Sequence, residues 1–433
     1  MHADDIRRLC VIALAGLLIG GSVLPNSDPT DFVTVARADV HTRPSDPAAV
    51  SVSADGRYVA FASNARLTPA DQNTASDIYV LDRQTGIVSL ETPVSGEHSG
   101  SARAPQLNAT GRILVYEAGV DGRSVMVRDR LAGSTRSLAT AVSRPGSSHS
   151  PRISSAGDRV AFASSAVDLV EGIDANGSGE DVYLFDVPSE RYQRVSVDDR
   201  GRQRAAGSSF GPDISLDGRY VAFTSSAPLD EATSPDRRTL VSNVYLRDTQ
   251  SGTTIRISVG SRGGAANGSS YDPSVSADGR YVAFVSEATN LVKERDANHA
   301  PDVFVRDTVT HVTQLISRRV SGNTANGPST RPRISADGGT VVFQSDASDM
   351  VCGGSCALAD RDINLVTDIF ACDRRSRAVR RISRGAAAWM EPSVGPAMDA
   401  SGTVIAFSSR HPRHASDDQD DFDLFVWSPK LPD

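Results

Sequence analysis

The sequence predicts an all-β protein: a seven-bladed β-propeller of four-stranded blades, closed by an N-terminal strand that completes the last blade. Three observations support this prediction. An apolar segment with a central turn recurs seven times, further strand-like segments accompany each copy, and the last copy lacks a fourth strand that a segment near the N-terminus can supply. The chain of 433 residues, 39% apolar and 23% charged, has the composition of an ordinary globular protein.

The repeated segment reads SVSADGRYVAF and ends at Phe61. Repeats at a period of a few tens of residues are typical of solenoids and propellers. The other copies end 46 to 64 residues apart, at Tyr116, Phe162, Phe223, Phe284, Phe343 and Phe407.

Each copy has a glycine in its turn, at positions 56, 111, 157, 218, 279, 338 and 402. The preceding residue is an aspartate in only four copies, Asp55, Asp217, Asp278 and Asp337. A tight hairpin needs a positive φ, which glycine tolerates best, whereas the residue before it only favours a short polar side chain. The aspartate is therefore interpreted as a turn residue and not as a catalytic acid.

The fifth unit illustrates the four strands of a blade. Pro273–Ser276 and Tyr281–Ser286 flank the turn, and Asp302–Asp307 and His311–Ser317 follow. The second of these strands is apolar on both faces, as expected of a strand that packs between two other sheets. The predicted blades cover approximately residues 49–92, 104–140, 150–197, 211–259, 272–318, 331–384 and 395–428.

The closing strand is predicted at residues 30–37, so that the propeller covers residues 30–431. The segment Thr30–Arg37 resembles the fourth strands of other units and would pair with the last blade. Such closure removes the exposed edges that an open sheet would have.

Residues 1–24 predict a signal peptide, because Arg7 and Arg8 precede an apolar run from Leu9 to Leu24. An uncleaved N-terminal anchor is the alternative. No second membrane segment follows, so we expect an exported protein that is periplasmic, associated with the cell envelope or secreted. In an oxidising compartment Cys352 and Cys356 are candidates for a disulfide, with free thiols or a zinc site as alternatives.

The repeat P-x-[IV]-S-x-D-G-R-x-V-A-F, followed by D-[IV]-[YF]-V, resembles the TolB-type propeller repeat of bacterial exported proteins, a WD-repeat-like unit. The resemblance extends over nearly all of residues 30–431. It implies a propeller with a tendency to bind proteins or other ligands, and it implies no reaction. The α/β domain that precedes the propeller of TolB itself is not expected in the short segment before the first blade.

The long loops of a blade are predicted on one face of the propeller and the Asp-Gly-type turns on the other. Binding residues tend to lie on long loops, so this long-loop face and the adjacent mouth of the channel are the candidate site. Blade two, with only residues 119–123 in this loop, would leave a notch. The other long loops cover residues 64–76, 165–180, 226–242, 287–301, 346–367 and 410–422.

Four of these loops share a D-x-N pattern followed by an aspartate at the start of the third strand. Oxygen ligands at alternate positions can converge on Ca²⁺. The alternative is that Asp and Asn side chains shape the turn by binding backbone amides. The candidate residues are Asp71, Asn73 and Asp77; Asp174, Asn176 and Asp181; Asp296, Asn298 and Asp302; and Asp362, Asn364 and Asp368. No cofactor is required for the predicted fold, and Ca²⁺ is the one that the pattern permits.

A serine recurs three residues before the proline of the first strand, and variable residues follow it. These positions should surround the mouth of the channel, where they would bind a ligand or only hold water. They are Ser148, His149, Ser209, Phe210, Ser270, Tyr271, Ser329 and Ser393.

The function expected from these features is that of a non-catalytic, monomeric binding scaffold, whose long-loop face binds a protein or an envelope polymer. No serine-hydrolase elbow and no phosphate-binding glycine loop is found. The net charge of −8 disfavours nucleic acid as a partner. The alternatives are a channel-centred lyase or hydrolase that acts on a polysaccharide or peptide, and a calcium-stabilised scaffold.

Overall fold

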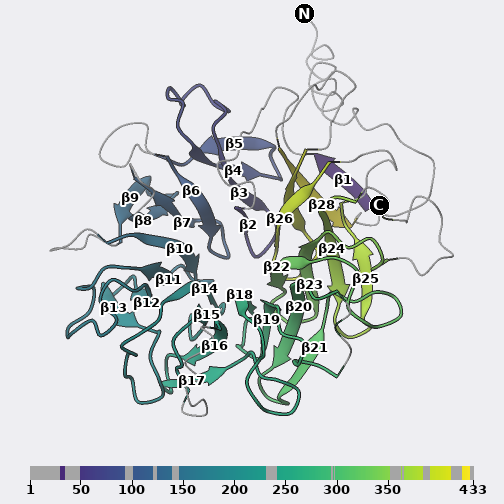
Figure 1. Ribbon diagram of the computed structural model, residues 1–433. Helices are drawn as coiled ribbons and strands as arrows, with labels where there is room; N and C mark the ends of the chain where they lie inside the picture. The colour runs from purple at the N-terminus through teal and green to yellow at the C-terminus, as the bar shows by residue number, and fades with distance from the viewer. Residues whose placement is uncertain are drawn as a thin grey trace, which may run out of the picture. The chain divides into compact units, whose positions relative to one another are not determined.

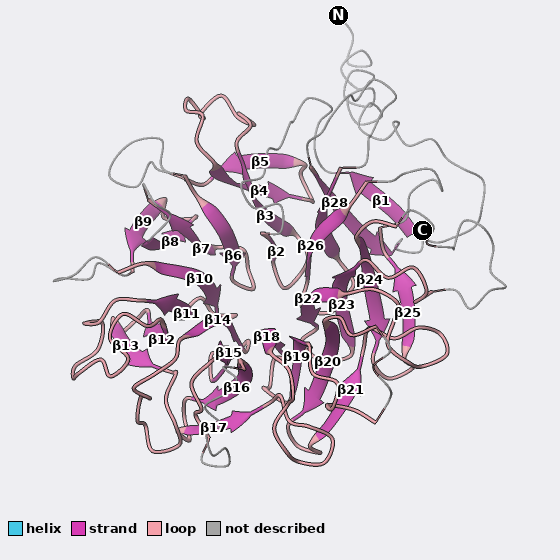
Figure 2. Ribbon diagram, viewed as in Figure 1, coloured by secondary structure: helices cyan, strands magenta, loops and turns pink. Residues whose placement is uncertain are grey.

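The computed structural model confirms the predicted propeller: it consists of four-stranded antiparallel sheets arranged as seven blades around an axis (Figures 1 and 2). It describes residues 30–34, 49–92, 101–119, 124–138, 146–230, 241–293, 296, 298–351, 362, 365–383, 391–410 and 422–429. The predicted signal peptide or anchor lies outside these ranges. Within them, no helix is long and apolar enough to cross a membrane.

Each blade runs from an inner strand beside the axis to a fourth strand at the rim. Blade one is β2 (Val50–Val52), β3 (Tyr58–Ser63), β4 (Asp77–Asp82) and β5 (Ile87–Leu90); blade two is β6 (Arg103–Leu107), β7 (Ile113–Ala118), β8 (Ser124–Asp129) and β9 (Ser134–Ser137); blade three is β10 (Ser148–Ile153), β11 (Arg159–Ser164), β12 (Asp181–Asp186) and β13 (Arg191–Arg194).

Blades four to six have the same order. Blade four is β14 (Ser209–Ile214), β15 (Tyr220–Ser225), β16 (Asn243–Asp248) and β17 (Thr253–Arg256); blade five is β18 (Ser270–Val275), β19 (Tyr281–Ser286), β20 (Asp302–Asp307) and β21 (Val312–Leu315); blade six is β22 (Ser329–Ile334), β23 (Thr340–Ser345), β24 (Asp368–Asp373) and β25 (Ala378–Arg381).

The seventh blade contains β26 (Ser393–Met398), β27 (Ile405–Ser409) and β28 (Asp423–Pro429), and its sheet has the order β1-β28-β27-β26, with β1 at Thr30–Thr34. The role of residues 30–37 in closing the ring stays a prediction, because residues 1–29 and 35–48 lie outside the described part of the chain.

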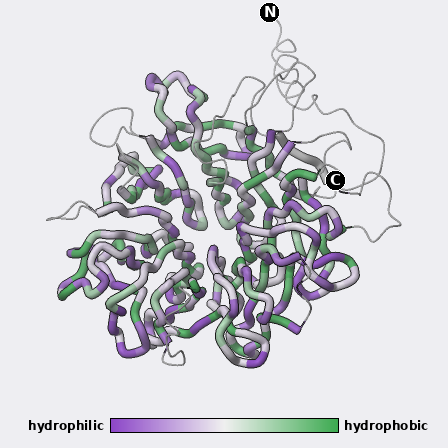
Figure 3. The backbone as a smooth tube through the Cα atoms, in the orientation of Figure 1, coloured by the Kyte–Doolittle hydropathy of each residue, from purple (hydrophilic) through white to green (hydrophobic). Residues whose placement is uncertain are grey.

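The apolar core lies at the seams between neighbouring blades. The described residues form seven core clusters, and each combines side chains from two adjacent blades. One of them joins blade seven to blade one, where Ala406 and Val426 pack with Val52 and Val59. Apolar stretches accordingly follow the strands, whereas hydrophilic colour is common in the loops (Figure 3). The prediction that the second strands are buried on both faces is thus confirmed.

The glycine in each turn has a positive φ, between 68° and 80°, in all seven blades. In the turn of blade five, Asp278 accepts hydrogen bonds from the Ser276 hydroxyl at 2.8 Å and from the Arg280 amide at 3.0 Å. Asp55, Asp217 and Asp337 accept equivalent bonds. The interpretation of this aspartate as a turn residue is confirmed.

The arginine after the turn has a structural role that the sequence left open. In blade four, Arg219 binds the Asp248 carboxylate at the end of the third strand in a two-point contact. Its guanidinium also lies 4.8 Å from the ring centroid of Tyr220. Equivalent ion pairs form in blades one, two and five, between Arg57 and Asp82, Arg112 and Asp129, and Arg280 and Asp307. In blade three, Asp158 follows the glycine, and the next residue, Arg159, pairs with Asp186 instead.

The inner strands of blades two to seven begin earlier than predicted and contain a bulge. In β10 the pairing with β11 shifts between His149 and Arg152, and Ser150 has a φ of +54°. Such a left-handed residue other than glycine costs about 1–3 kcal/mol and is often found at functional sites. The equivalent residue has a positive φ in the other five blades as well, at Ala104, Gly211, Asp272, Arg331 and Gly395. A proline follows each of them.

We expect Gly279→Ala to destabilise the protein more than Gly263→Ala. Both glycines have a positive φ, +72° and +83°, but a Cβ at Gly279 would lie 2.4 Å from Tyr220 of the preceding blade, whereas nothing lies within 4 Å of a Cβ at Gly263. Overpacking adds about 1–3 kcal/mol to the backbone cost that the two variants share. Thermal and denaturant unfolding measure the difference, and equal losses in both variants would contradict the proposed contact between blades.

Candidate functional site

The recurring serines at the start of the inner strands are buried and bonded within their own blades. The Ser148 hydroxyl lies 2.9 Å from that of Ser164 on the second strand. Because Ser148 is only 1% exposed, it offers no surface to a ligand. Ser209, Ser270, Ser329 and Ser393 form the same contact with the second strand at 2.8 to 2.9 Å.

The residues after these serines are half-buried and lie where each inner strand begins, at the end next to the long loops. His149, Phe210 and Tyr271 occupy this position in three consecutive blades. Arg103, Thr330 and Val394 occupy it in blades two, six and seven. We call these six residues the mouth ring.

His149 is the chemically most distinctive member of the mouth ring. Its Nε2 lies 2.8 Å from Oε1 of Glu180, and its Nδ1 lies 3.0 Å from Oγ of Ser150. With Nε2–H donating to the carboxylate, Nδ1 accepts the serine hydroxyl. A hydroxyl, an imidazole and a carboxylate therefore form one chain of hydrogen bonds, which is the arrangement that activates a hydroxyl or holds a general base.

The hydrogen bond from Glu180 raises the pKa of His149 above its ordinary value, although burial acts in the opposite direction. The same bond lowers the pKa of the Glu180 carboxyl. Both effects favour an imidazolium beside a carboxylate. The side chains are 24% and 34% exposed, so solvent still reaches the pair.

A second ion pair lies beside this relay. Glu117, 4% exposed, accepts hydrogen bonds from Arg103 Nε at 2.6 Å and from the Ser150 amide at 2.7 Å. The bond to Ser150 holds the residue that has the left-handed backbone, and the ion pair places a cationic side chain near His149. The Arg103 side chain is 47% exposed, so it remains accessible to a ligand.

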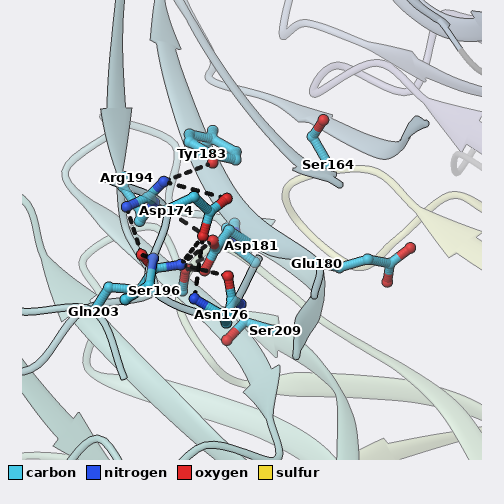
Figure 4. A network of polar contacts seen from close by, with 12 residues as sticks. Ser164, Asp174, Asn176, Glu180, Asp181, Tyr183, Arg194, Ser196, Gln203 and Ser209 are labelled. Atoms are coloured by element: carbon cyan, nitrogen blue, oxygen red, sulfur yellow. Dashed lines mark hydrogen bonds and ion pairs between the residues drawn. The ribbon is translucent and has the colours of Figure 1, made fainter. Parts of the chain in front are cut away.

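The acids of the long loop in blade three form a separate network (Figure 4). The Gln203 side-chain nitrogen lies 2.6 to 2.7 Å from oxygens of Asp174, Asn176 and Asp181. Arg194 lies 3.5 Å from Asp181 and 3.7 Å from Asp174. Glu180 precedes Asp181 in the chain but points away from this network, toward His149.

Arginine neutralises the loop acids in some blades and not in others. Arg194, Arg256 and Arg381 occupy the same position of the fourth strand in blades three, four and six, and each contacts a loop aspartate. Blades one and five have Leu90 and Leu315 there instead. In these two blades the loop acids are Asp71 with Asp77 and Asp296 with Asp302.

In blades one and five the loop acids bond to neutral groups. Asp71 accepts the Tyr79 hydroxyl at 2.6 Å and the Asn73 amide at 3.0 Å. Asp296 accepts the amides of Asn298 and His299, and Asp302 accepts the Ser317 hydroxyl. Burial raises the pKa of Asp302 to about 7 and that of Asp77 above its usual range.

The turn-shaping role of the loop residues is evident, and calcium binding stays a prediction. The described residues contain no group of three or more His, Cys, Asp or Glu side chains that could hold a metal ion. Asp362 and Asp368 both lie near Arg381 at 3.4 Å, and Asn364 lies outside the described residues. Cys352 and Cys356, the disulfide candidates, also lie outside them.

Sequence reasoning proposed His149, Phe210 and Tyr271 but missed Arg103, Glu117, Ser150 and Glu180. An alignment of the repeats contains a signal for two of them. Glu117 stands where the other second strands have Ala, Thr, Val, Gln or Ser, and Arg103 is equivalent to His149. Glu180 could not be found in this way, because it ends a loop of variable sequence.

No protein-family model and no curated protein sequence matches the chain. Among solved structures, oligogalacturonate lyase from Vibrio parahaemolyticus matches with a TM-score of 0.57 at 11% identity, covering 94% of this chain and 98% of the lyase. An oligogalacturonate lyase in complex with manganese matches with a TM-score of 0.55 at 14% identity over 94% and 97% of the two chains. TolB from Acinetobacter baumannii matches with a TM-score of 0.43 at 15% identity over 80% and 67%.

The two lyase matches support a β-propeller fold, whereas membership in the TolB-type repeat family and export stay predictions. The expectation of a non-catalytic scaffold, and of a protein that is not an enzyme, is corrected. That expectation depended on finding no catalytic module beside the propeller. A propeller that spans nearly the whole of the Vibrio parahaemolyticus chain is a lyase, so the fold needs no such module to be an enzyme.

Replacement of Glu180 should lower the pKa of His149. The raised pKa means that the pair contributes its full stabilisation below the ordinary pKa of histidine and loses it as the pH rises through the raised value. In Glu180→Gln, NMR titration of His149 should give a lower pKa, and this pH-dependent part of the stability should shrink. Glu171→Gln, in an exposed part of the same loop, is the control. An unchanged His149 titration would contradict the hydrogen bond.

If the acids of the long loops bind Ca²⁺, calcium should raise the melting temperature of the protein. The increase should depend on the loop acids of blades one and five. Ca²⁺ at 100 times its dissociation constant adds about 2.7 kcal/mol per site. The variant Asp77→Asn with Asp302→Asn should lose this response. Asp181→Asn with Asp368→Asn should keep it, because Arg194 and Arg381 already neutralise those loops. Equal melting temperatures of the unaltered protein in Ca²⁺ and in chelator would contradict the prediction.

Proposed function

We propose that the protein is an enzyme that cleaves an acidic polysaccharide at the mouth of the propeller, by removing a proton from a sugar carbon. The hydrogen bond between His149 Nε2 and Glu180, at the partly exposed mouth, is the observation that supports this most directly, because it leaves Nδ1 as the basic nitrogen. The similarity in fold to oligogalacturonate lyase supports the choice of substrate class.

In the proposed reaction, His149 is the base. Its Nδ1 takes the proton from the carbon next to the sugar carboxylate, while Nε2–H remains bonded to Glu180. The electron pair of that C–H bond forms a carbon–carbon double bond, and the bond from the neighbouring carbon to the glycosidic oxygen breaks. The leaving oxygen takes up a proton, which the imidazolium can return.

The other residues of the mouth ring suit such a substrate. Arg103 is partly exposed beside His149 and can bind a carboxylate, whose charge it would stabilise as the proton leaves. Phe210 and Tyr271 follow in the next two blades and present aromatic surface on which a sugar ring can pack. In the sequence, blade two has the shortest of the loops between second and third strands, residues 119–123.

No step of this reaction is routed through a metal. The manganese in the related structure belongs to that lyase. In the described part of this chain, no group of three or more His, Cys, Asp or Glu side chains could hold a metal ion.

A second candidate function is ester hydrolysis with Ser150 as nucleophile. When His149 is neutral with its proton on Nε2, the Ser150 hydroxyl can donate to Nδ1, and the left-handed backbone of Ser150 resembles the strained geometry in which some nucleophiles are held. In this reaction Ser150 would be indispensable. In the elimination it would be dispensable, because the proposed proton transfer runs from the sugar carbon to His149 and needs no nucleophile.

Incubation with polygalacturonate tests the proposal, because elimination creates a double bond conjugated to a carboxylate that absorbs ultraviolet light. We expect this absorbance with the unaltered protein and a loss of about 10²–10⁴-fold in rate for His149→Gln. His311→Gln, on an exposed turn of blade five, should keep full activity. The rate should rise with pH as His149 loses its proton, and Glu180→Gln should move this rise to lower pH.

The outcomes separate the two functions. If Ser150→Ala still forms the product that absorbs ultraviolet light, elimination is supported. Release of acid from ester substrates, lost completely in Ser150→Ala, supports the hydrolase instead. If neither the unaltered protein nor the control variant converts either class of substrate, the proposed function is wrong.

A further inference from the structure

Two arginines lie on the inner strands farther along the axis than the mouth ring. Arg152 in β10 and Arg333 in β22 occupy the same position, directly after the proline that follows the left-handed residue. They belong to blades three and six, which are not neighbours, and the inner strands of both blades line the axis (Figure 1). Neither residue takes part in the relay of His149.

Each arginine lies near the carboxylate of one aspartate, in a long ion pair. Arg152 Nε lies 3.4 Å from Oδ1 of Asp213, and Arg333 Nη1 lies 3.5 Å from Oδ1 of Asp272. Both contacts join a single pair of atoms and are longer than the usual 2.7–2.9 Å of a charge-assisted hydrogen bond. Asp213 uses its other oxygen for the Val275 amide at 2.8 Å. The two carboxylates therefore neutralise the arginines only in part.

The guanidinium groups are held in place but keep unused donors. Nη1 of Arg152 donates to the Pro151 carbonyl at 3.1 Å, and Nη1 of Arg333 donates to the Pro332 carbonyl at 2.8 Å. Within the described residues, no hydrogen bond uses Nη2 of either arginine. The side chains are 19% and 25% exposed, so solvent reaches them.

The charges of these groups act on one another across the axis. Burial lowers the pKa of Arg152 and the positive charge of Arg333 lowers it further, whereas the negative charges of Asp213, Asp272 and Glu117 act in the opposite direction. Burial also raises the pKa of Asp213, which disfavours the negative charge that would offset the two arginines. The two guanidinium groups share this space with Asp213 and Asp272, so an anion that binds the unused donors must compete with these carboxylates.

We propose that Arg152 and Arg333 together bind a small oxyanion, of the carboxylate or phosphate class, on the axis of the propeller. The planar guanidinium group matches the spacing of oxyanion oxygens, so Nη2 of each arginine can donate to one ligand between them. This site lies beyond the proposed active site and does not depend on the reaction there. Asp213 and Asp272 would be competing internal anions.

Calorimetric titration with inorganic phosphate, at constant ionic strength and without any polysaccharide, tests the site. We expect one phosphate per chain, and at least about tenfold weaker binding in Arg152→Gln and in Arg333→Gln. Arg136→Gln is the matched control, because Arg136 pairs with Glu190 on a fourth strand away from the axis and should bind phosphate as the unaltered protein does. A parallel titration with acetate distinguishes the sources: binding of both ions indicates a carboxylate site, and binding of phosphate alone indicates a phosphate site.

Replacing an aspartate should change the affinity for phosphate in the opposite direction to replacing an arginine. This test does not need the arginine variants to fold. If Asp213 competes with the ligand, Asp213→Asn should bind phosphate more tightly than the unaltered protein. If the arginines serve only as internal partners of the aspartates, Asp213→Asn should melt at a lower temperature without any gain in binding, and that result would overturn the proposal. Absence of phosphate and acetate binding in the unaltered protein would overturn it as well.

Discussion

The whole propeller depends on the burial of each second strand between two neighbouring blades. A single four-stranded sheet of this chain cannot cover both faces of strands such as Tyr220–Ser225, in which every residue after the first is buried. The seven seam clusters supply the missing cover, and the cluster between blades seven and one completes the ring by packing. Burial of this kind contributes about 25 cal/mol per Å² of apolar surface, so a blade gains most of its stability from its neighbours.

The ring then determines what the inner strands can do. Because blades pack side by side, the beginnings of the inner strands meet at one end of the axis, and six of these strands contain a bulge there. The left-handed backbone at Ser150 costs free energy that the surrounding hydrogen bonds must offset, among them the bond from its amide to buried Glu117. One local distortion, repeated in each blade, thus produces a varied set of side chains at the mouth and farther along the axis.

The charge of the buried loop aspartates is balanced differently from one blade to the next. Buried aspartates at the start of the third strand lie beside an arginine in blades three and six, Arg194 and Arg381, although burial still raises the pKa of Asp181 to about 6. Blade five has Leu315 in place of that arginine, and there burial shifts the pKa of Asp302 to about 7. Sequence repeats that give the same backbone therefore differ in electrostatics, and these differences distinguish structural loops from candidate cation sites.

The sequence by itself determined the fold, the number of blades and the role of the Asp-Gly turn, because strand alternation and the positive φ of a hairpin glycine such as Gly279 are local properties that recur in every repeat. It also indicated His149 by its position in the repeat. Only the tertiary structure decided that Ser148 is buried against Ser164, that His149 meets Glu180, and that Arg152 and Arg333 share the axis. The serine pair and the His149–Glu180 pair lie within blade three, 16 and 31 residues apart in the chain, so strand register and loop path bring them together. Arg152 and Arg333 are 181 residues apart in different blades, so only the ring of blades puts both beside the axis.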